Sequence, residues 1–209
     1  RLFRPPSAEE RATARQAFGI PPDAVVIGSF QKDGVGWGSG MKPKLIKGPD
    51  TLLNVISKLK RDFPVHVFLT GPARGYVKKG LERIDVPFTH TYVKTHAELS
   101  RCYHALDLYF VTSREEGGPK GIMEAMASSV PVVSTRVGMA LDLIKPGVTG
   151  GLVEPEEDAA FADQAGRILA MPNNAIALRD RAYEAVQSTD WSHVGKQHYD
   201  LVYKPLLAR

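Results

Sequence analysis

Apolar residues are distributed along the chain in two alternating patterns. Short runs rich in β-branched and aromatic residues predict buried strands, whereas apolar residues repeated three or four positions apart predict amphipathic helices. The strands expected from the short runs are 24–28, 65–69, 86–91, 108–111, 130–134 and 151–153. The helices expected from the helical spacing are 49–59, 76–84, 96–106, 122–127, 161–169, 175–186 and 191–207.

Strands that alternate with helices predict right-handed β–α–β units, and hence a parallel sheet covered by helices on both faces. We therefore expect an α/β fold: a doubly wound, Rossmann-like parallel sheet of about six strands with C-terminal helices, residues 1–209 forming a single domain. Sheets of this kind bind ligands at the carboxyl ends of their strands. The loops of interest are those after Gly28, after Leu69 and around Val93, and the segment 112–121.

The composition excludes several classes of protein. The chain has 209 residues, of which 43% are hydrophobic, enough to build a core and too many for a disordered chain. No apolar run approaches the roughly 20 residues of a membrane-spanning helix. The first residues, Arg-Leu-Phe-Arg-Pro-Pro, contain neither an initiator methionine nor the apolar core of a signal peptide, so we interpret the chain as part of a longer protein. The single cysteine suits a reducing compartment.

The charge is mildly basic, with 27 Lys and Arg residues against 23 Asp and Glu residues and a net charge of +4. This permits an anionic ligand such as a phosphate. The basic residues are spread along the chain instead of clustering with aromatic ones, which argues against nucleic-acid binding. The six histidines show no metal-binding spacing, and there is no Asp-x-Asp pair to hold a divalent ion with a nucleotide diphosphate. We therefore expect neither a metal nor a cofactor.

Residues 34–40 form a glycine-rich segment soon after the first expected strand. They do not match a dinucleotide-binding loop, because Ser39 or Met41 stands where the third glycine of that motif is needed. Lys47-Gly48 likewise has the reverse order of the Gly-Lys-Ser/Thr that ends a Walker phosphate loop. Two interpretations of the segment remain open: a surface loop, or a lid over a ligand.

The most specific pattern is the segment 113–127, Ser-Arg-Glu-Glu-Gly-Gly-Pro-Lys-Gly-Ile-Met-Glu-Ala-Met-Ala, which follows a strand and opens a helix. Glu116 and Glu124 stand eight positions apart across glycines whose backbone N–H groups can approach a ligand closely. The helix N-terminus favours an anion such as a phosphate, and a carboxylate beside it can accept hydrogen bonds from sugar hydroxyls. The alternative is that Glu116 is solvated and Glu124 only complements the helix dipole.

Lys47 precedes the first expected helix in the sequence Lys-Gly-Pro-Asp, and further lysines lie upstream at positions 32, 42 and 44. From such a position a lysine can reach a diphosphate as a point charge. The alternative, an ordinary surface lysine, fits Lys42 and Lys44 better than Lys47.

Together, these segments resemble the C-terminal, donor-binding half of the retaining glycosyltransferases of family four, which have the GT-B fold. The resemblance covers most of the chain in the family's order. The segments that carry it are 25–29, 47–48, 68–71, 105–113, 116–124, 130–134, 137–138, 147–153 and 190–194.

The resemblance implies a metal-independent, retaining hexosyltransferase in which a sugar leaves a nucleotide diphosphate by a same-face displacement. It implies that Glu116 lies against the donor sugar as a stabiliser and that Lys47 neutralises the departing diphosphate, so these two are the expected catalytic residues. Glu124 would hold the ribose hydroxyls, the amides of Gly117 to Lys120 would bind the sugar and distal phosphate, and the backbone at Val93 would meet the base. The full set of implied substrate-binding positions is Gly28, Ser29, Lys32, Gly71, Val93, Gly117, Gly118, Pro119, Lys120 and Glu124.

Two positions depart from the family pattern. Ser29 stands where the family commonly has Arg, so Lys32 or another cation would have to substitute, and Gly118 stands where an aromatic residue is common. These departures favour an alternative, a nucleotide-sugar-binding module without catalytic activity. A third possibility is a GT-B relative with different chemistry, such as a nucleotide-sugar epimerase or a phosphorylase that holds pyridoxal phosphate on a lysine.

The resemblance also implies partners. The donor would be a UDP-, GDP- or ADP-linked sugar, and the acceptor would bind to an N-terminal domain of the same chain that is absent here, toward which the final helix, 190–209, would return. The fragment alone would bind nucleotides weakly and transfer almost nothing. We expect the whole enzyme to act in polysaccharide, lipopolysaccharide or glycoconjugate synthesis, in the cytoplasm or at the inner membrane surface through the missing half.

Overall fold

The computed structural model describes residues 2–207, and only the backbone for residues 172–175. Its centre is a sheet of six parallel strands in the order β3-β2-β1-β4-β5-β6. The strands are β1 Val25–Phe30, β2 Val65–Thr70, β3 Phe88–Thr91, β4 Leu108–Val111, β5 Val132–Thr135 and β6 Gly151–Val153. The predicted doubly wound α/β fold is confirmed, and its order reverses between β1 and β4, where such sheets bind ligands.

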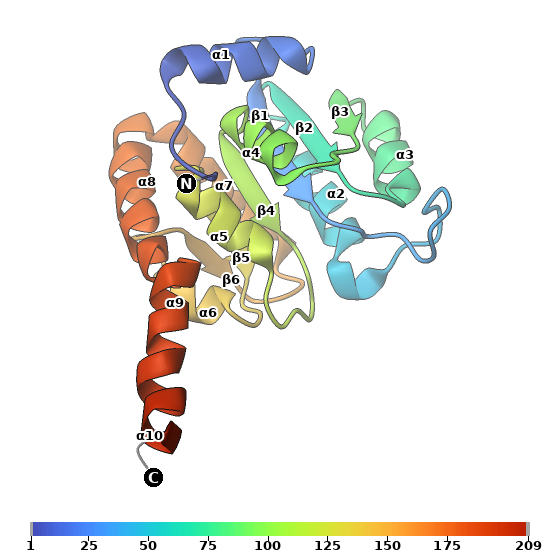
Figure 1. The fold of residues 1–209 in the computed structure, drawn as a ribbon. Coiled ribbons are helices and arrows are strands. Elements are labelled where there is room, and N and C mark those ends of the chain that lie inside the picture. The colour runs from blue at the N-terminus through green and yellow to red at the C-terminus, as the bar shows by residue number, and fades with distance from the viewer. Residues whose placement is uncertain (1, 208–209) are drawn as a thin grey trace.

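Helices cover both faces of the sheet (Figure 1). Helices α2, α3 and α7 contribute to one hydrophobic cluster, and helices α4, α5 and α8 contribute to the other. Their bounds are α2 Pro49–Leu59, α3 Gly75–Arg83, α4 His96–His104, α5 Lys120–Ala127, α6 Ala140–Leu143, α7 Asp158–Ala170 and α8 Pro172–Val186. Because successive strand residues point to opposite faces, Leu108 packs into the first cluster and Tyr109 into the second.

The first strand is longer than its sequence pattern suggests. A strand ending at Gly28 was expected, but β1 continues to Phe30. A Cβ atom on Gly28 would lie 2.4 Å from Cδ1 of Leu106, so this glycine makes room for a core side chain and does not end the strand. The expectation of a strand-terminating glycine is therefore wrong.

An N-terminal helix, α1 Ala8–Ala17, was not expected, because it has almost no apolar periodicity. Its signal is a capping box, in which the Ser7 hydroxyl accepts from the Glu10 N–H and the Glu10 carboxylate accepts from the Ser7 N–H. It lies at the amino end of the sheet (Figure 1). Arg15 holds it there, with its Nη2 2.6 Å from Oδ2 of Asp107.

The C-terminal residues continue as helix, as predicted for 191–207. A 3-10 turn, η2 Gln187–Thr189, leads into α9 Trp191–His198, a π-helical turn at Tyr199–Tyr203 and α10 Lys204–Leu207. This arm extends away from the sheet (Figure 1). It carries exposed apolar side chains such as Trp191, at 86%. The last two residues of the predicted helix 190–209 lie outside the described residues. Within residues 2–207, no helix is long and apolar enough to cross a membrane.

Candidate functional site

An ion pair stands at the carboxyl ends of the strands, where the fold is expected to bind a ligand. Nζ of Lys47, at the end of the 3-10 turn η1 Leu45–Lys47, donates to Oε2 of Glu116 in the loop after β4. Both side chains are about one-fifth exposed, at 21% and 20%. The Ser113 hydroxyl also lies 3.3 Å from Oε2 of Glu116. The structure therefore brings the two predicted catalytic residues together.

Gly48 is what allows Lys47 to approach this loop. Its φ is +60°, and a Cβ atom there would lie 1.8 Å from the carbonyl oxygen of Thr112 at the end of β4. The Thr112 hydroxyl donates to the Gly48 carbonyl at 2.9 Å. Because only glycine accepts both the left-handed conformation and the close contact, the Lys-Gly sequence places Lys47 directly against the β4 loop.

A second connection between the same two loops is made by Arg114. Its Nη1 and Nη2 donate to the two carboxylate oxygens of Asp50 at 2.9 and 2.7 Å, and its Nε donates to Glu156 at 2.8 Å. The hydrogen bonds from Arg114 hold the pKa of Asp50 below its usual value. The sequence motif contains Arg114 but does not reveal its role, because its partners Asp50 and Glu156 are distant in sequence.

The glycine turn after Glu116 is open to solvent. Gly117 and Gly118 are exposed, and α5 begins at Lys120 without a side-chain cap. The back of the turn rests on the β5–α6 loop, where a Cβ atom on Gly138 would lie 2.0 Å from the Gly117 carbonyl oxygen. Pro119 has no N–H, so the donors of this turn are the amides of the other residues. Such amides at a helix N-terminus suit an anion.

Glu124 lies half-buried on α5, where its Oε2 accepts a hydrogen bond of 2.9 Å from the Tyr103 hydroxyl. Burial raises the pKa of Glu124, and the Tyr103 hydrogen bond opposes this. Glu124 makes no hydrogen bond or ion pair with Lys47 or Glu116 in the described part of the chain. The two predicted carboxylates therefore have separate environments.

The cation that contacts Ser29 is not Lys32 but a residue from another loop, Arg74. Nη1 and Nη2 of Arg74 lie 2.6 Å from the Ser29 carbonyl oxygen and 3.2 Å from its hydroxyl, and Arg74 also forms an ion pair with Asp33 in which neither side chain is exposed. Lys32 instead places its Nζ 3.7 Å from the ring centroid of Trp37. The cation beside Ser29 is thus Arg74, which sequence reasoning did not single out, and it is sealed from solvent.

The remaining predicted positions lie in the core or at strand ends. Gly28 is buried inside β1. Gly71 turns the chain after β2 with φ +86°, and its carbonyl accepts a hydrogen bond of 2.8 Å from Nε2 of His90. Val93 follows β3 and packs against the core. The parallel topology puts Gly71 and Val93 at the same carboxyl edge of the sheet as Lys47.

The glycine-rich segment 34–40 is attached at its base. Cβ atoms on Gly34 and Gly40 would lie 2.2 and 2.0 Å from the carbonyl oxygen of Ala73, so both glycines are needed for the loop to pass over this peptide. The N–H of Gly75 donates to the Ser39 carbonyl at 2.8 Å. The side chain of Trp37, at the tip, is 83% exposed.

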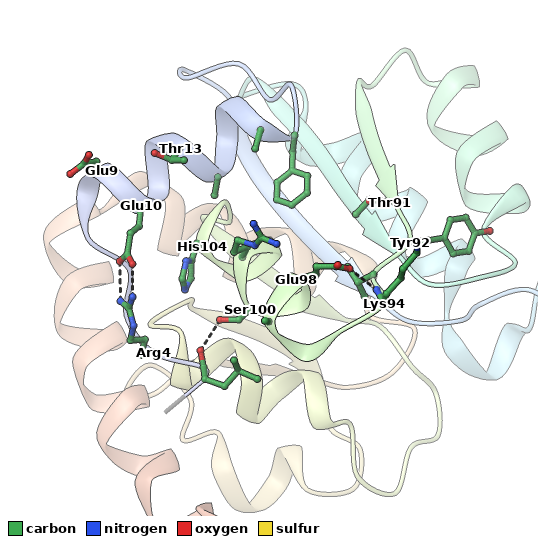
Figure 2. A pocket seen from close by; sticks show the side chains of 17 residues that line it. Arg4, Glu9, Glu10, Thr13, Thr91, Tyr92, Lys94, Glu98, Ser100 and His104 are labelled. Atoms are coloured by element: carbon green, nitrogen blue, oxygen red, sulfur yellow. Dashed lines mark hydrogen bonds and ion pairs between the residues drawn. The ribbon is translucent and has the colours of Figure 1, made fainter.

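A cavity of about 940 Å³ lies between α1, α4 and the segment after β3 (Figure 2). It is bordered by the Arg4–Glu10 ion pair and by the hydrogen bond from Ser100 to the Leu2 carbonyl. Val93 is the one predicted site residue in its lining, so this cavity is separate from the Lys47–Glu116 pair. Among residues 2–207, no group of three or more His, Cys, Asp or Glu side chains could hold a metal ion.

The sequence profile of the family described as glycosyl transferases group 1 matches residues 32–171. The chain belongs to this family. The D-inositol 3-phosphate glycosyltransferase of Corynebacterium urealyticum is 30% identical to it over 209 residues, covering 92% of this chain and 46% of that protein. The resemblance found in the motifs is confirmed.

Solved structures share the fold. The sucrose-phosphate synthase of Thermosynechococcus elongatus superposes with a TM-score of 0.80 at 25% identity, covering 100% of this chain and 51% of that chain. The HepE protein of Anabaena, solved with UDP-glucose, superposes with a TM-score of 0.81 at 22% identity, covering 97% of this chain and 54% of that chain. The chain thus spans about half the length of each of these three proteins.

Proposed function

We propose that the chain is the donor-binding part of a retaining glycosyltransferase that transfers a sugar from a nucleotide sugar to an acceptor. The observation that carries this proposal is the Lys47–Glu116 pair, formed in the loop that continues into the exposed Gly117–Gly118 turn at the carboxyl edge of the sheet. The family membership and the UDP-glucose bound in the HepE structure support a nucleotide-sugar donor. UDP-, GDP- and ADP-linked sugars remain alternatives.

The chemistry requires the bond between the sugar's anomeric carbon and the diphosphate oxygen to break, leaving negative charge on the diphosphate. We assign the stabilisation of that charge to the Lys47 ammonium and the amides of the glycine turn, which are already oriented before reaction. On donor binding, the diphosphate takes the place of Glu116 as the partner of Lys47. Glu116 is then released to accept hydrogen bonds from sugar hydroxyls and to stabilise positive charge on the sugar.

Glu124 is proposed to accept hydrogen bonds from the ribose hydroxyls of the nucleotide. Glu124 lies on α5, the helix that begins with Lys120 at the end of the glycine turn, and this supports a ribose bound next to the diphosphate. With one lysine and several amides supplied by the protein, the reaction is proposed to need neither a metal nor a cofactor. The acceptor is assigned to the part of the protein that lies outside this chain.

A second function, nucleotide-sugar binding without catalysis, is favoured by the surroundings of Ser29. The guanidinium of Arg74 is sealed against Asp33 and the Ser29 carbonyl, so it offers no charge to a diphosphate. A site with fewer free cations would bind the donor but stabilise the leaving group less.

Calorimetric titration with UDP, GDP, ADP and their sugar conjugates tests the proposed donor site. We expect saturable binding of one nucleotide, weakened by Glu124→Ala, and almost no transfer by this chain alone. Absence of binding to every nucleotide, both here and in a longer chain with the acceptor-binding half, would contradict the proposal. If the longer chain with Glu116→Ala still binds the nucleotide and transfers sugar at the wild-type rate, the catalytic group is a residue other than Glu116.

A further inference from the structure

The buried hydroxyl of Tyr103 is aimed at one oxygen of Glu124. Tyr103 lies on α4 with 0% of its surface exposed, and its hydroxyl donates to Oε2 of Glu124 at 2.9 Å. In the described part of the chain, Oε1 of Glu124 has no hydrogen-bond partner. One carboxylate oxygen is therefore fixed by the protein, and the other remains available as an acceptor.

The Tyr103 ring is held by an aromatic cluster. Its centroid lies 4.9 Å from that of Phe30, 5.4 Å from that of Tyr109 and 5.8 Å from that of Phe3. Since these rings fix the direction of the hydroxyl, the position of Glu124 Oε2 follows from core packing. A hydrogen bond from a hydroxyl to a carboxylate is also stronger than one between neutral groups.

The electrostatics of Glu124 depend on this bond. Burial raises the pKa of Glu124, while the Tyr103 hydroxyl, then His96 and Lys120, lower it. Tyr109 is the other titratable group packed here, and burial raises its pKa to about 12, so it stays neutral. The Tyr103 hydrogen bond is thus the main interaction that favours the carboxylate form of Glu124.

We propose that Tyr103 is a positioning residue for nucleotide binding: it fixes Oε2 of Glu124 and leaves Oε1 to accept hydrogen bonds from the ribose of a nucleoside diphosphate. This inference rests on the proposed function of Glu124. It assigns to α4, outside the Glu116–Glu124 motif, a part in recognising the donor.

Tyr103→Phe tests this with little change in packing, because the ring is kept and only the hydroxyl is lost. We expect binding of the preferred nucleotide among UDP, GDP and ADP to weaken about tenfold at neutral pH, the size expected for one hydrogen bond to a charged group. The acid side of the binding profile should move to higher pH, since Glu124 loses a group that favours its charged form. A purely structural role would not move this profile.

Tyr76→Phe is the matched control. It removes a tyrosine hydroxyl from a partly buried ring on α3 that packs against the other hydrophobic cluster, away from Glu124. We expect it to bind the nucleotide as the wild type does. In the Glu124→Gln background, Tyr103→Phe should cause a smaller further loss than in the wild type. Equal losses in the two backgrounds would overturn the proposal.

A measurement without nucleotide separates this inference from the proposed function. The carboxyl ¹³C resonance of Glu124 reports its pKa directly, and Tyr103→Phe should shift that pKa upward while Tyr76→Phe should not. An unchanged pKa in the Tyr103 variant would overturn the positioning role. An upward shift in a chain that binds none of UDP, GDP and ADP would instead contradict the proposed function and, with it, the assignment of Oε1 to a ribose.

Discussion

Two ion pairs stand near the carboxyl ends of the strands and differ in exposure. In the Arg74–Asp33 pair, both side chains are fully buried, with Nη2 and Oδ2 3.0 Å apart. In the Lys47–Glu116 pair, each side chain is about one-fifth exposed. Arg74 also donates to three backbone carbonyls, those of Ser29, Gln31 and Thr70. The buried pair therefore joins β1 to β2, whereas the exposed pair can exchange a partner with a ligand.

The difference follows from desolvation. A buried charge has no water to replace a lost partner, so its ion pair is strongly coupled to the fold. Burial raises the pKa of Asp33, and the neighbouring Arg74 opposes this rise. An accessible pair contributes little to stability and can be broken with little effect on the fold. We infer that the Arg74–Asp33 pair stabilises the fold at the ends of the strands. The Lys47–Glu116 pair can open to bind a ligand with little loss of stability.

The largest expected effect is that of Arg74→Met. It leaves the Asp33 carboxylate buried without a cation, so the free energy of unfolding should fall by about 3–5 kcal/mol in urea denaturation. Adding Asp33→Leu to Arg74→Met should restore part of the loss, because no buried charge remains although the carbonyls that Arg74 paired stay without a donor. A fall below about 1 kcal/mol in the single variant would show that the pair is not coupled to the fold as its burial suggests.

The exposed pair should respond in the opposite way. In the longer protein with its acceptor-binding half, Lys47→Met should lower the rate of sugar transfer by about 10²–10³-fold, as for removal of a donor that stabilises developing charge. The free energy of unfolding should change by less than about 1 kcal/mol. Sugar transfer at the wild-type rate would show that Lys47 is not a catalytic residue.

Gly48→Ala tests the backbone that places Lys47. The added Cβ would meet the Thr112 carbonyl and a left-handed backbone, so we expect a loss of about 1–3 kcal/mol in unfolding free energy. Nucleotide affinity should fall as well, because Lys47 is displaced. Gly19→Ala is a suitable control, since Gly19 has a similar φ of +65° but a Cβ atom there meets nothing within 4 Å.

The smallest effect concerns the Arg114–Asp50 pair, and its sign follows from the lowered pKa of Asp50. Because the folded state favours the carboxylate, Asp50 contributes stability above its unfolded pKa near 3.8 that is lost as pH falls through its lower folded pKa. Both side chains are about a quarter to a third exposed, so we expect only about 0.5 kcal/mol. As pH is lowered from 6 to 2, roughly the window of this titration, the free energy of unfolding should fall less in Asp50→Asn than in the wild type.

Much of the fold can be predicted because strand and helix patterns are local. The run at 65–69 becomes β2 Val65–Thr70, and the apolar spacing after Pro49 becomes α2. The fully parallel topology then places the Lys47 and Glu116 loops at one edge without any knowledge of their contacts. The same patterns do not predict helix α1, because Ala14 and Arg15 are its only buried residues and they form no apolar stripe.

The residue pattern is enough to predict the α/β class, the edge of the sheet that carries the site, and the residue types suited to an anionic sugar donor. Which residues become partners is visible only in the folded chain: Arg74 with Asp33, Tyr103 with Glu124, and Leu106 filling the space at Gly28. The spacing of apolar residues predicts which side chains are buried. Which side chains contact each other depends on the surfaces that meet when helices pack on the sheet, and those surfaces come from segments far apart in the chain.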